Sequence, residues 1–342
     1  MRHIYLDYFR AISIIIIIAG HSYGSWLHES LAGQSVANMV TGGTALFVFI
    51  SGFFFKEIFC PRFKFSKFMN KKLQTVLLPY VLLSFAGMAL KIVVEGDLDF
   101  PITLHADPLY NNLLSVPANL ITGRTLTAYW YIPFAMLIFV ASPAIIRLLA
   151  LPQKTVIALT MICFALSMQI HRPEMNLNPV HAMVYYFPFY MLGAIYSTNR
   201  QQADDWIRAN LPALGVAFVC VAVAMNFGGQ TGNATKANPL LWTGIDHMVL
   251  QKGLLISVLL GLCKKLESAR ITPLSYIAGI SFALFFLHPW VLSVIAISGL
   301  DAHLVGLPGF VARALIALIA SIAVAELVRA ALKQRSRFVI GY

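Results

Sequence analysis

The chain has 342 residues, of which 59% are hydrophobic and 11% are charged, and its formal net charge at pH 7 is +11. Ordinary soluble domains contain about 25% charged residues, so this chain cannot hide its apolar surface in one water-soluble core. Basic residues that bind nucleic acid cluster on a soluble face, and because no soluble domain is visible, the composition excludes a nucleic-acid-binding protein and indicates a membrane protein.

Long apolar segments follow one another along the whole chain. A helix needs about 20 predominantly apolar residues to cross the hydrocarbon core of a bilayer. The apolar runs predict an all-α fold, a polytopic bundle of about ten transmembrane helices in a single integral-membrane domain over residues 1–342. The predicted spans lie near residues 11–27, 38–58, 73–94, 128–149, 154–170, 181–198, 211–227, 243–262, 275–297 and 307–332.

Lysine and arginine are distributed unevenly among the connecting segments. If the N-terminus lies inside, most of the 25 Lys and Arg residues fall in segments on the cytoplasmic side. This is the bias that the positive-inside rule describes, so we expect both termini in the cytoplasm. The longest outer segment, near residues 95–127, is too long for a bare connection and is expected to fold back on the membrane as a binding rim.

Arg10 stands at the cytoplasmic mouth of the first span, and His21 follows eleven positions later within it. Eleven steps of about 100° bring the two side chains to within about 20° of each other around the helix, separated by about 16 Å along it. They therefore share one face. Asp7 stands three residues before Arg10, where its carboxylate can hold the guanidinium. An ionisable residue inside a span is costly, which makes each of these a functional candidate.

Each of these residues also has a structural interpretation. Arg10 alone can be a positive anchor at the cytoplasmic end, and His21 alone can be a packed residue bonded to a neighbouring helix. Their position on one face of an Ile-rich helix favours a site instead. Histidine is the natural general base near neutral pH, so His21 is the candidate that removes the proton of an attacking hydroxyl.

A basic, aromatic-rich stretch from Lys56 to Lys72 precedes the third span. Its charges set the topology and attract anionic membrane lipids. The functional alternative is that Lys71 and Lys72, next to the third span, bind the phosphates of a donor that enters from the cytoplasm. Lysine binds phosphate as a point charge, which suits a ligand that must leave after each turnover.

Two pairs of residues mark later spans. Trp130 and Tyr131 open the fourth span on its outer side, where interfacial aromatics are common, and the alternative is that they stack on a sugar ring. His288 and Pro289 lie deep in the ninth span. A proline there frees a backbone carbonyl that the histidine can help to satisfy, so His288 has a structural interpretation beside the functional one.

Motifs of several other protein classes are missing from the sequence. It contains no phosphate-binding glycine loop, no serine elbow and no helix-borne pair of metal-ligand histidines. ATP-driven transport, serine hydrolysis and zinc chemistry therefore have no support. The four cysteines have no paired spacing, so they predict neither a disulfide framework nor a metal site.

Over nearly its whole length the chain resembles the acyltransferase-3 family of bacterial membrane acyltransferases. The most specific feature of the resemblance is an arginine followed eleven positions later by a histidine in the first helix, here Arg10 and His21. The segment GGTALFVFISGFFF is similar to the family's second-helix segment, which ends in Ser-Gly-Phe or Ser-Gly-Tyr, and Ser51 is its serine. Further similar segments are KFMNKKLQTVLLPY before and into the third helix, Trp130 with Tyr131, and the late His288 with Pro289.

The chain also departs from the family pattern. Members often have arginines before the third helix, where this sequence has Lys71 and Lys72, which leaves the details of phosphate recognition open. Many members carry an outward hydrolase-like domain after the last span, and we expect none here. An acceptor would then be met by the membrane domain itself or by a partner.

The resemblance implies an O-acyltransferase of the bacterial inner membrane. It implies transfer of an acyl group, usually acetyl from acetyl-CoA, from cytoplasmic acyl-CoA to a sugar hydroxyl of a cell-surface or lipid-linked glycan, without a metal. His21 is then the general base, Arg10 positions the donor, and Lys71 and Lys72 bind it. The residues expected to bind the acceptor or support the site are Asp7, Ser51, Trp130, Tyr131 and His288.

A permease or flippase for a sugar or lipid-linked glycan is the alternative function. His21 and His288 would then be substrate or proton-relay groups. Transporters of this size tend to show two similar halves with interrupted helices, and the sequence shows no such repeat. The acyl chain, the acceptor and the oligomeric state are left open.

Overall fold

A computed structural model describes residues 3–24, 30–98 and 100–342. Almost all of their regular structure is helical, because a long apolar segment in a membrane must satisfy its backbone hydrogen bonds within itself. The strands in this part of the chain are β1 (Arg172–Pro173) and β2 (Thr235–Lys236), which pair in parallel. The predicted all-α polytopic bundle is confirmed.

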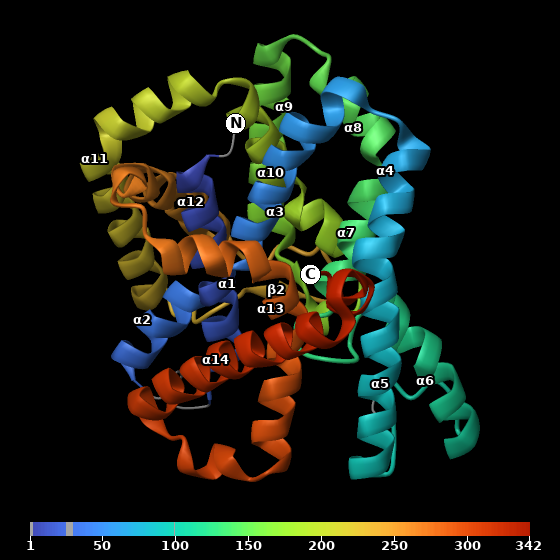
Figure 1. Cartoon of the computed structure of the whole chain (residues 1–342). Coiled ribbons are helices and arrows are strands. Elements are labelled where there is room, and N and C mark those ends of the chain that lie inside the picture. Colours follow the sequence, from blue (N-terminus) through green and yellow to red (C-terminus); the bar gives the residue numbers. More distant parts are fainter. Residues whose placement is uncertain (1–2, 25–29, 99) are drawn as a thin grey trace.

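The α-helices are arranged as a bundle with the N-terminus at one end (Figure 1). In chain order they are α1 (Ile4–His21), α2 (Leu31–Val40), α3 (Thr44–Phe54), α4 (Phe65–Lys72), α5 (Leu78–Glu95), α6 (Pro108–Thr122), α7 (Tyr131–Val140), α8 (Ser142–Leu149), α9 (Gln153–Ile170), α10 (Pro179–Thr198), α11 (Arg200–Phe227), α12 (His247–Lys265), α13 (Thr272–Ile297), α14 (Gly306–Leu332) and α15 (Arg337–Ile340).

Eight helical segments of the described chain are long and apolar enough to cross a membrane, and the bent pair α7 and α8 is a ninth if it forms one span. The pair is bent by 60°, and Pro143 at the start of α8 explains the bend because it lacks a backbone N–H. Every predicted span contains a helix, although α10 is not among the eight. The exact number of spans and the cytoplasmic position of the termini stay predictions, and residues 25–27 of the first predicted span lie outside the described residues.

Helices α3 and α10 approach each other backbone to backbone. A Cβ atom added to Gly52 would collide with the carbonyl oxygen of Tyr190, and one added to Gly193 would collide with that of Phe49. Small residues allow such close packing between membrane helices. Gly52 of the Ser-Gly-Phe segment therefore has a packing role, and it fixes the position of the neighbouring Ser51.

The second predicted span is broken between α2 and α3. Gly42 at the break has φ +72°, a left-handed conformation that glycine adopts without strain. The buried Lys252 donates from Nζ to the carbonyl oxygens of Asn38 and Met39, both at 3.1 Å, and Gln251 donates to the Asn38 oxygen at 3.0 Å. These bonds satisfy the carbonyls that the end of α2 leaves open.

The predicted outer segment near residues 95–127 contains a helix of its own, α6. The Asp107 carboxylate caps it by accepting from the backbone N–H groups of Leu109 at 2.9 Å and Tyr110 at 3.3 Å. Figure 1 shows α6 beside α5, with the two helices spreading apart toward their lower ends in this view.

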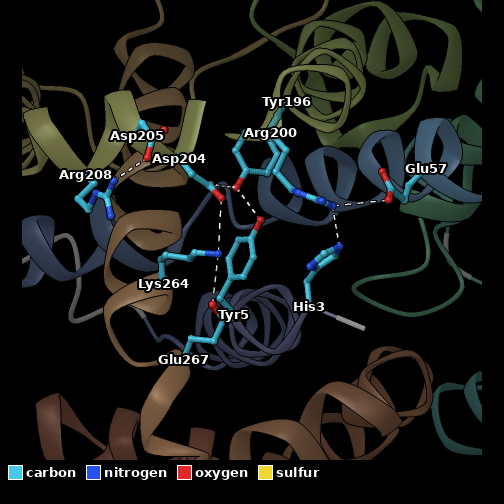
Figure 2. A network of polar contacts seen from close by, with 10 residues as sticks. All are labelled: His3, Tyr5, Glu57, Tyr196, Arg200, Asp204, Asp205, Arg208, Lys264 and Glu267. Carbon is cyan, nitrogen blue, oxygen red and sulfur yellow. Dashed lines mark hydrogen bonds and ion pairs between the residues drawn. The ribbon is translucent and has the colours of Figure 1, made fainter. Parts of the chain in front are cut away.

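A polar network joins the ends of α1, α10, α11 and α12 near the N-terminus (Figure 2). The hydroxyls of Tyr5 and Tyr196 are 2.9 Å apart, and Tyr196 also donates to the Asp204 carboxylate. Asp204 lies 3.6 Å from the ammonium of Lys264, which lies 4.2 Å from the centre of the Tyr5 ring. The contacts form a closed circuit around the first turn of α1.

A second branch of the network holds the residue that precedes α1. The guanidinium of Arg200 donates to His3 Nε2 at 2.6 Å and lies 3.5 Å from the Glu57 carboxylate (Figure 2). Burial and the positive Arg200 lower the pKa of His3 below its ordinary value. His3 is therefore neutral at pH 7 and accepts the hydrogen bond from Arg200.

We expect Asp204→Ala to lower the free energy of unfolding of the protein without changing the residues of its candidate active site. It removes the acceptor of Tyr196 and the partner of Lys264 at a site where the aspartate side chain is 17% exposed. Loss of such a partner costs about 1–3 kcal/mol. The matched control is Asp205→Ala, whose carboxylate pairs with Arg208 at an exposed position and should change stability by less than about 0.5 kcal/mol. Equal melting temperatures of the two variants in detergent would contradict a stabilising role for the network.

Candidate active site

His21 ends α1 and faces two other parts of the bundle. Its Nδ1 lies 3.2 Å from the hydroxyl of Thr127, in the loop before α7. Its ring centre lies 5.5 Å from that of His288 in the middle of α13. Three segments that are far apart in the sequence therefore meet at His21.

The tautomer of His288 is set by the backbone of its own helix. Its Nδ1 lies 2.8 Å from the carbonyl oxygen of Leu284, which can only accept, so Nδ1 carries the proton. The other ring nitrogen, Nε2, is then a hydrogen-bond acceptor. It is buried and has no partner in the described part of the chain, and the whole residue is 0% exposed. The bonded carbonyl is that of Leu284, whereas Pro289 leaves that of Phe285 without its helical donor, so this bond is not the predicted one. His288 does present an available acceptor beside the His21 ring.

A small cavity of about 30 Å³ adjoins His21. A water molecule needs roughly 10–15 Å³ of such space, so the cavity admits a water molecule or a single hydroxyl group and little more. It lies at the break between α2 and α3, and its lining includes Thr41, Gly42, Trp130, Arg172 and Asn233. The hydrogen bonds that Gln251 and Lys252 donate to the end of α2 hold this break in place, and they therefore also help to fix the wall of this cavity.

Arg172 and Asn233 reach the His21 cavity through the β1–β2 pairing. Arg172 belongs to β1, and Asn233 lies two residues before β2. The guanidinium carbon of Arg172 lies 4.1 Å from the centre of the Trp130 ring, and its Nε donates to the Asn176 side chain at 2.8 Å. Sequence reasoning missed both residues, because each lies in an irregular segment and carries no local motif.

A larger cavity of about 310 Å³ adjoins Arg10, nearer the N-terminal end of α1. Ser51 and Tyr131 also line it, and their hydroxyl oxygens are 3.4 Å apart. Asp7 pairs with Arg10 at 3.5 Å, as its spacing predicted. Lys72 lines the same cavity, so four residues predicted for the site meet here although they come from four different helices.

The two neighbouring lysines differ in their surroundings. The Lys72 ammonium lies 4.5 Å from the ring centre of Phe139, and at 5.4 and 5.5 Å from those of Phe59 and Phe68. Lys71 is exposed, does not line the cavity, and lies 5.6 Å from the Phe59 ring. Of the predicted donor-binding pair, the structure brings only Lys72 together with Arg10.

The adjacent residues Trp130 and Tyr131 are also separated. Trp130 lines the small cavity at His21 and Tyr131 the large cavity at Arg10. Trp130 is 4% exposed, with Arg172 over its ring and Phe134 stacked at 5.6 Å. Its ring has little open surface for a sugar, and its position supports Arg172 instead.

The two cavities are thus arranged along α1, with Arg10 at one and His21 at the other. They share no lining residue. The helical rise over eleven residues separates Arg10 from His21 by about 16 Å. A ligand that contacts both must therefore be long and narrow. In residues 3–24, 30–98 and 100–342, no group of three or more His, Cys, Asp or Glu side chains could hold a metal ion.

Comparison with known proteins identifies the family. The family model described as an acyltransferase domain, of the acyltransferase-3 type, matches residues 3–328. No curated protein and no solved structure matches the chain. The match covers the first-helix arginine and histidine, the whole lining of the small cavity, the lining of the larger cavity except Gly341, and every helix up to the last turn of α14. The chain therefore belongs to the acyltransferase-3 family of membrane acyltransferases.

Proposed function

We propose that this acyltransferase moves an acyl group, acetyl in the first instance, from cytoplasmic acyl-CoA to a sugar hydroxyl of a cell-surface or lipid-linked glycan at the bacterial inner membrane. The observation that carries the proposal is the pair of cavities along α1. One has Arg10 and Lys72 beside polar hydroxyls, and the other has His21 in a space the size of one hydroxyl group. Residues 1–342 are proposed to act as one catalytic domain.

The donor side of the proposal rests on the shape and charge of the larger cavity. Acyl-CoA combines a phosphorylated nucleotide with a long, narrow arm that ends in the thioester. The two cations, Arg10 and Lys72, suit its phosphates or the polar groups of the arm, and the phenylalanines around Lys72 suit its apolar parts. Entry at this cavity would point the thioester along α1 toward His21.

The chemical step needs a base at the acceptor hydroxyl. We infer that His21 takes the hydroxyl proton while the oxygen attacks the thioester carbonyl. An ester C–O bond forms, the C–S bond breaks, and the thiolate of coenzyme A leaves with the proton that His21 returns. The hydroxyl of Thr127 orients the His21 ring through Nδ1, and the Nε2 acceptor of His288 favours the imidazolium that forms during the step.

The decisive test of this function is transfer of label. Purified protein in detergent or proteoliposomes is incubated with [¹⁴C]acetyl-CoA and a glycan mixture from the membrane of its source cell. We expect acid-stable, base-labile label on the glycan, as for an O-acetyl ester. Uptake of unmodified glycan into proteoliposomes without label transfer would support the permease instead and contradict the proposal.

The neighbouring lysines supply a matched pair for the donor site. We expect Lys72→Gln to raise the KM for acetyl-CoA at least about tenfold and to leave the KM for the acceptor within twofold, because a charge-assisted contact contributes about 1.5–3 kcal/mol. Lys71→Gln removes the same charge outside the cavity and should change neither value by more than about twofold. The measurement is steady-state kinetics with either substrate varied. A KM for acetyl-CoA that is unchanged in both variants would make the pair membrane anchors only.

A further inference from the structure

A second polar cavity, of about 300 Å³, adjoins the small one at His21. The two share Thr41, Arg172 and Asn233, so these three residues stand at the junction between them. The small cavity has room for a hydroxyl group only, whereas the adjoining one is the size of a small-molecule site. We call this adjoining cavity the outer cavity. A large molecule could occupy it and extend one hydroxyl group into the small cavity toward His21.

The lining of this outer cavity is polar and carries one sign of charge. Arg172 is its cation, and no aspartate or glutamate is among its lining residues in the described chain. The other polar groups are hydroxyls and amides, such as those of Tyr23, Thr231 and Asn176. A single arginine in a half-buried site without a carboxylate is complementary to an acidic group on a ligand.

Asn233 supplies a second, independent feature. Its side-chain oxygen Oδ1 is buried and has no hydrogen-bond partner among the described residues. The preceding residue is held in place, because the Gly232 N–H donates to Asn38 Oδ1 at 2.7 Å. A buried carbonyl oxygen left without a donor is costly, and a hydroxyl group of a ligand would satisfy it.

The backbone on either side of Arg172 is strained, and such strain often occurs at functional sites. His171, Met175 and Asn176 have φ values of +56°, +48° and +56°, which residues with a side chain rarely adopt. His171 has its ring nitrogen Nε2 3.1 Å from the Gly244 oxygen, and its own carbonyl oxygen accepts from His181 at 3.1 Å. Surrounding contacts thus impose the turn that brings Arg172 over Trp130.

We infer that the outer cavity is the acceptor site and that the acceptor is an acidic sugar. Its carboxylate or phosphate binds the Arg172 guanidinium, one hydroxyl donates to Asn233 Oδ1, and a neighbouring hydroxyl enters the small cavity at His21. This assignment rests on the proposed function, because it names the substrate class of the same site. The Trp130 ring positions the guanidinium.

The test separates acidic from neutral acceptors. Glycans from the source cell are divided by anion exchange into an acidic and a neutral fraction, and each is incubated with the protein and [¹⁴C]acetyl-CoA. We expect wild type to label the acidic fraction at least tenfold more efficiently. Methyl esterification of the carboxylates in one aliquot and enzymatic removal of phosphates in another show which acid is read, because only the relevant treatment should abolish the preference.

Three variants assign the preference to Arg172. Arg172→Gln should raise the KM for the acidic fraction at least about tenfold while the KM for acetyl-CoA stays within twofold. Arg172→Lys keeps the charge and should restore most of the preference. Lys91→Gln is the matched control, since it removes one positive charge from the end of α5 at a residue that lines neither cavity, and it should behave as wild type.

Two results would overturn the inference. One is equal labelling of the two fractions by wild type, and the other is an Arg172→Gln variant that keeps the wild-type preference. If wild type labels neither fraction, the proposed function fails. The outer cavity is then judged by binding alone, as a rise in melting temperature that the acidic fraction produces in wild type. If Arg172→Gln removes this rise the acidic site stands, and if wild type shows no rise the site is refuted.

Discussion

Substitution of His21 by alanine is expected to lower kcat by about 10²- to 10⁴-fold, the usual contribution of a general base. The residue lies at a cavity of about 30 Å³ that admits one hydroxyl group, with Thr127 holding Nδ1 and His288 beside the ring. Alanine removes the base and leaves the rest of the cavity in place. The measurement is transfer of label from acetyl-CoA per amount of folded protein in detergent.

Two companion variants make this result specific. His21→Gln keeps a side chain of similar length that can still bond to Thr127, so its loss of activity would exclude a collapse of the cavity as the cause. His303→Ala removes an exposed histidine elsewhere and should leave kcat unchanged. Activity of His21→Ala within twofold of wild type, at equal protein amount and melting temperature, would refute the base assignment.

Arg10→Lys should fold normally and lose at least about tenfold in kcat/KM, which corresponds to about 1.4 kcal/mol of transition-state binding. Lysine keeps the positive charge near the start of α1, so insertion should be preserved if charge alone matters. It loses the planar fork that can hold Asp7 and a donor group at once. Arg10 lines the larger cavity with Lys72, where such a donor group would lie.

The interpretation of Arg10 depends on which substitutions are tolerated. Arg62→Lys, at an exposed position on the same side of the predicted membrane, is the control and should be fully active. If Arg10→Lys is also fully active and only Arg10→Glu fails, Arg10 is a topological anchor. The first-helix arginine would then have no part in donor binding.

The sequence by itself determined the class of fold and the first helix of the site. Apolar runs of about 20 residues can form little else than membrane helices, because lipid satisfies no backbone hydrogen bonds. Helical periodicity placed Arg10 and His21 on one face and Asp7 within reach of the guanidinium, and the structure has the Asp7–Arg10 pair. These relations are local, since they depend on 3.6 residues per turn within one helix.

Only the tertiary structure decided which residues share a cavity. Lys71 and Lys72 have the same sequence context, yet only Lys72 turns into the Arg10 cavity, and Trp130 and Tyr131 face different cavities although they are adjacent. Arg172 reaches Trp130 from a turn held by β1 and β2, which lie more than 60 residues apart. Helix packing and strained turns set these contacts across long sequence separations, and no periodicity within one segment encodes them.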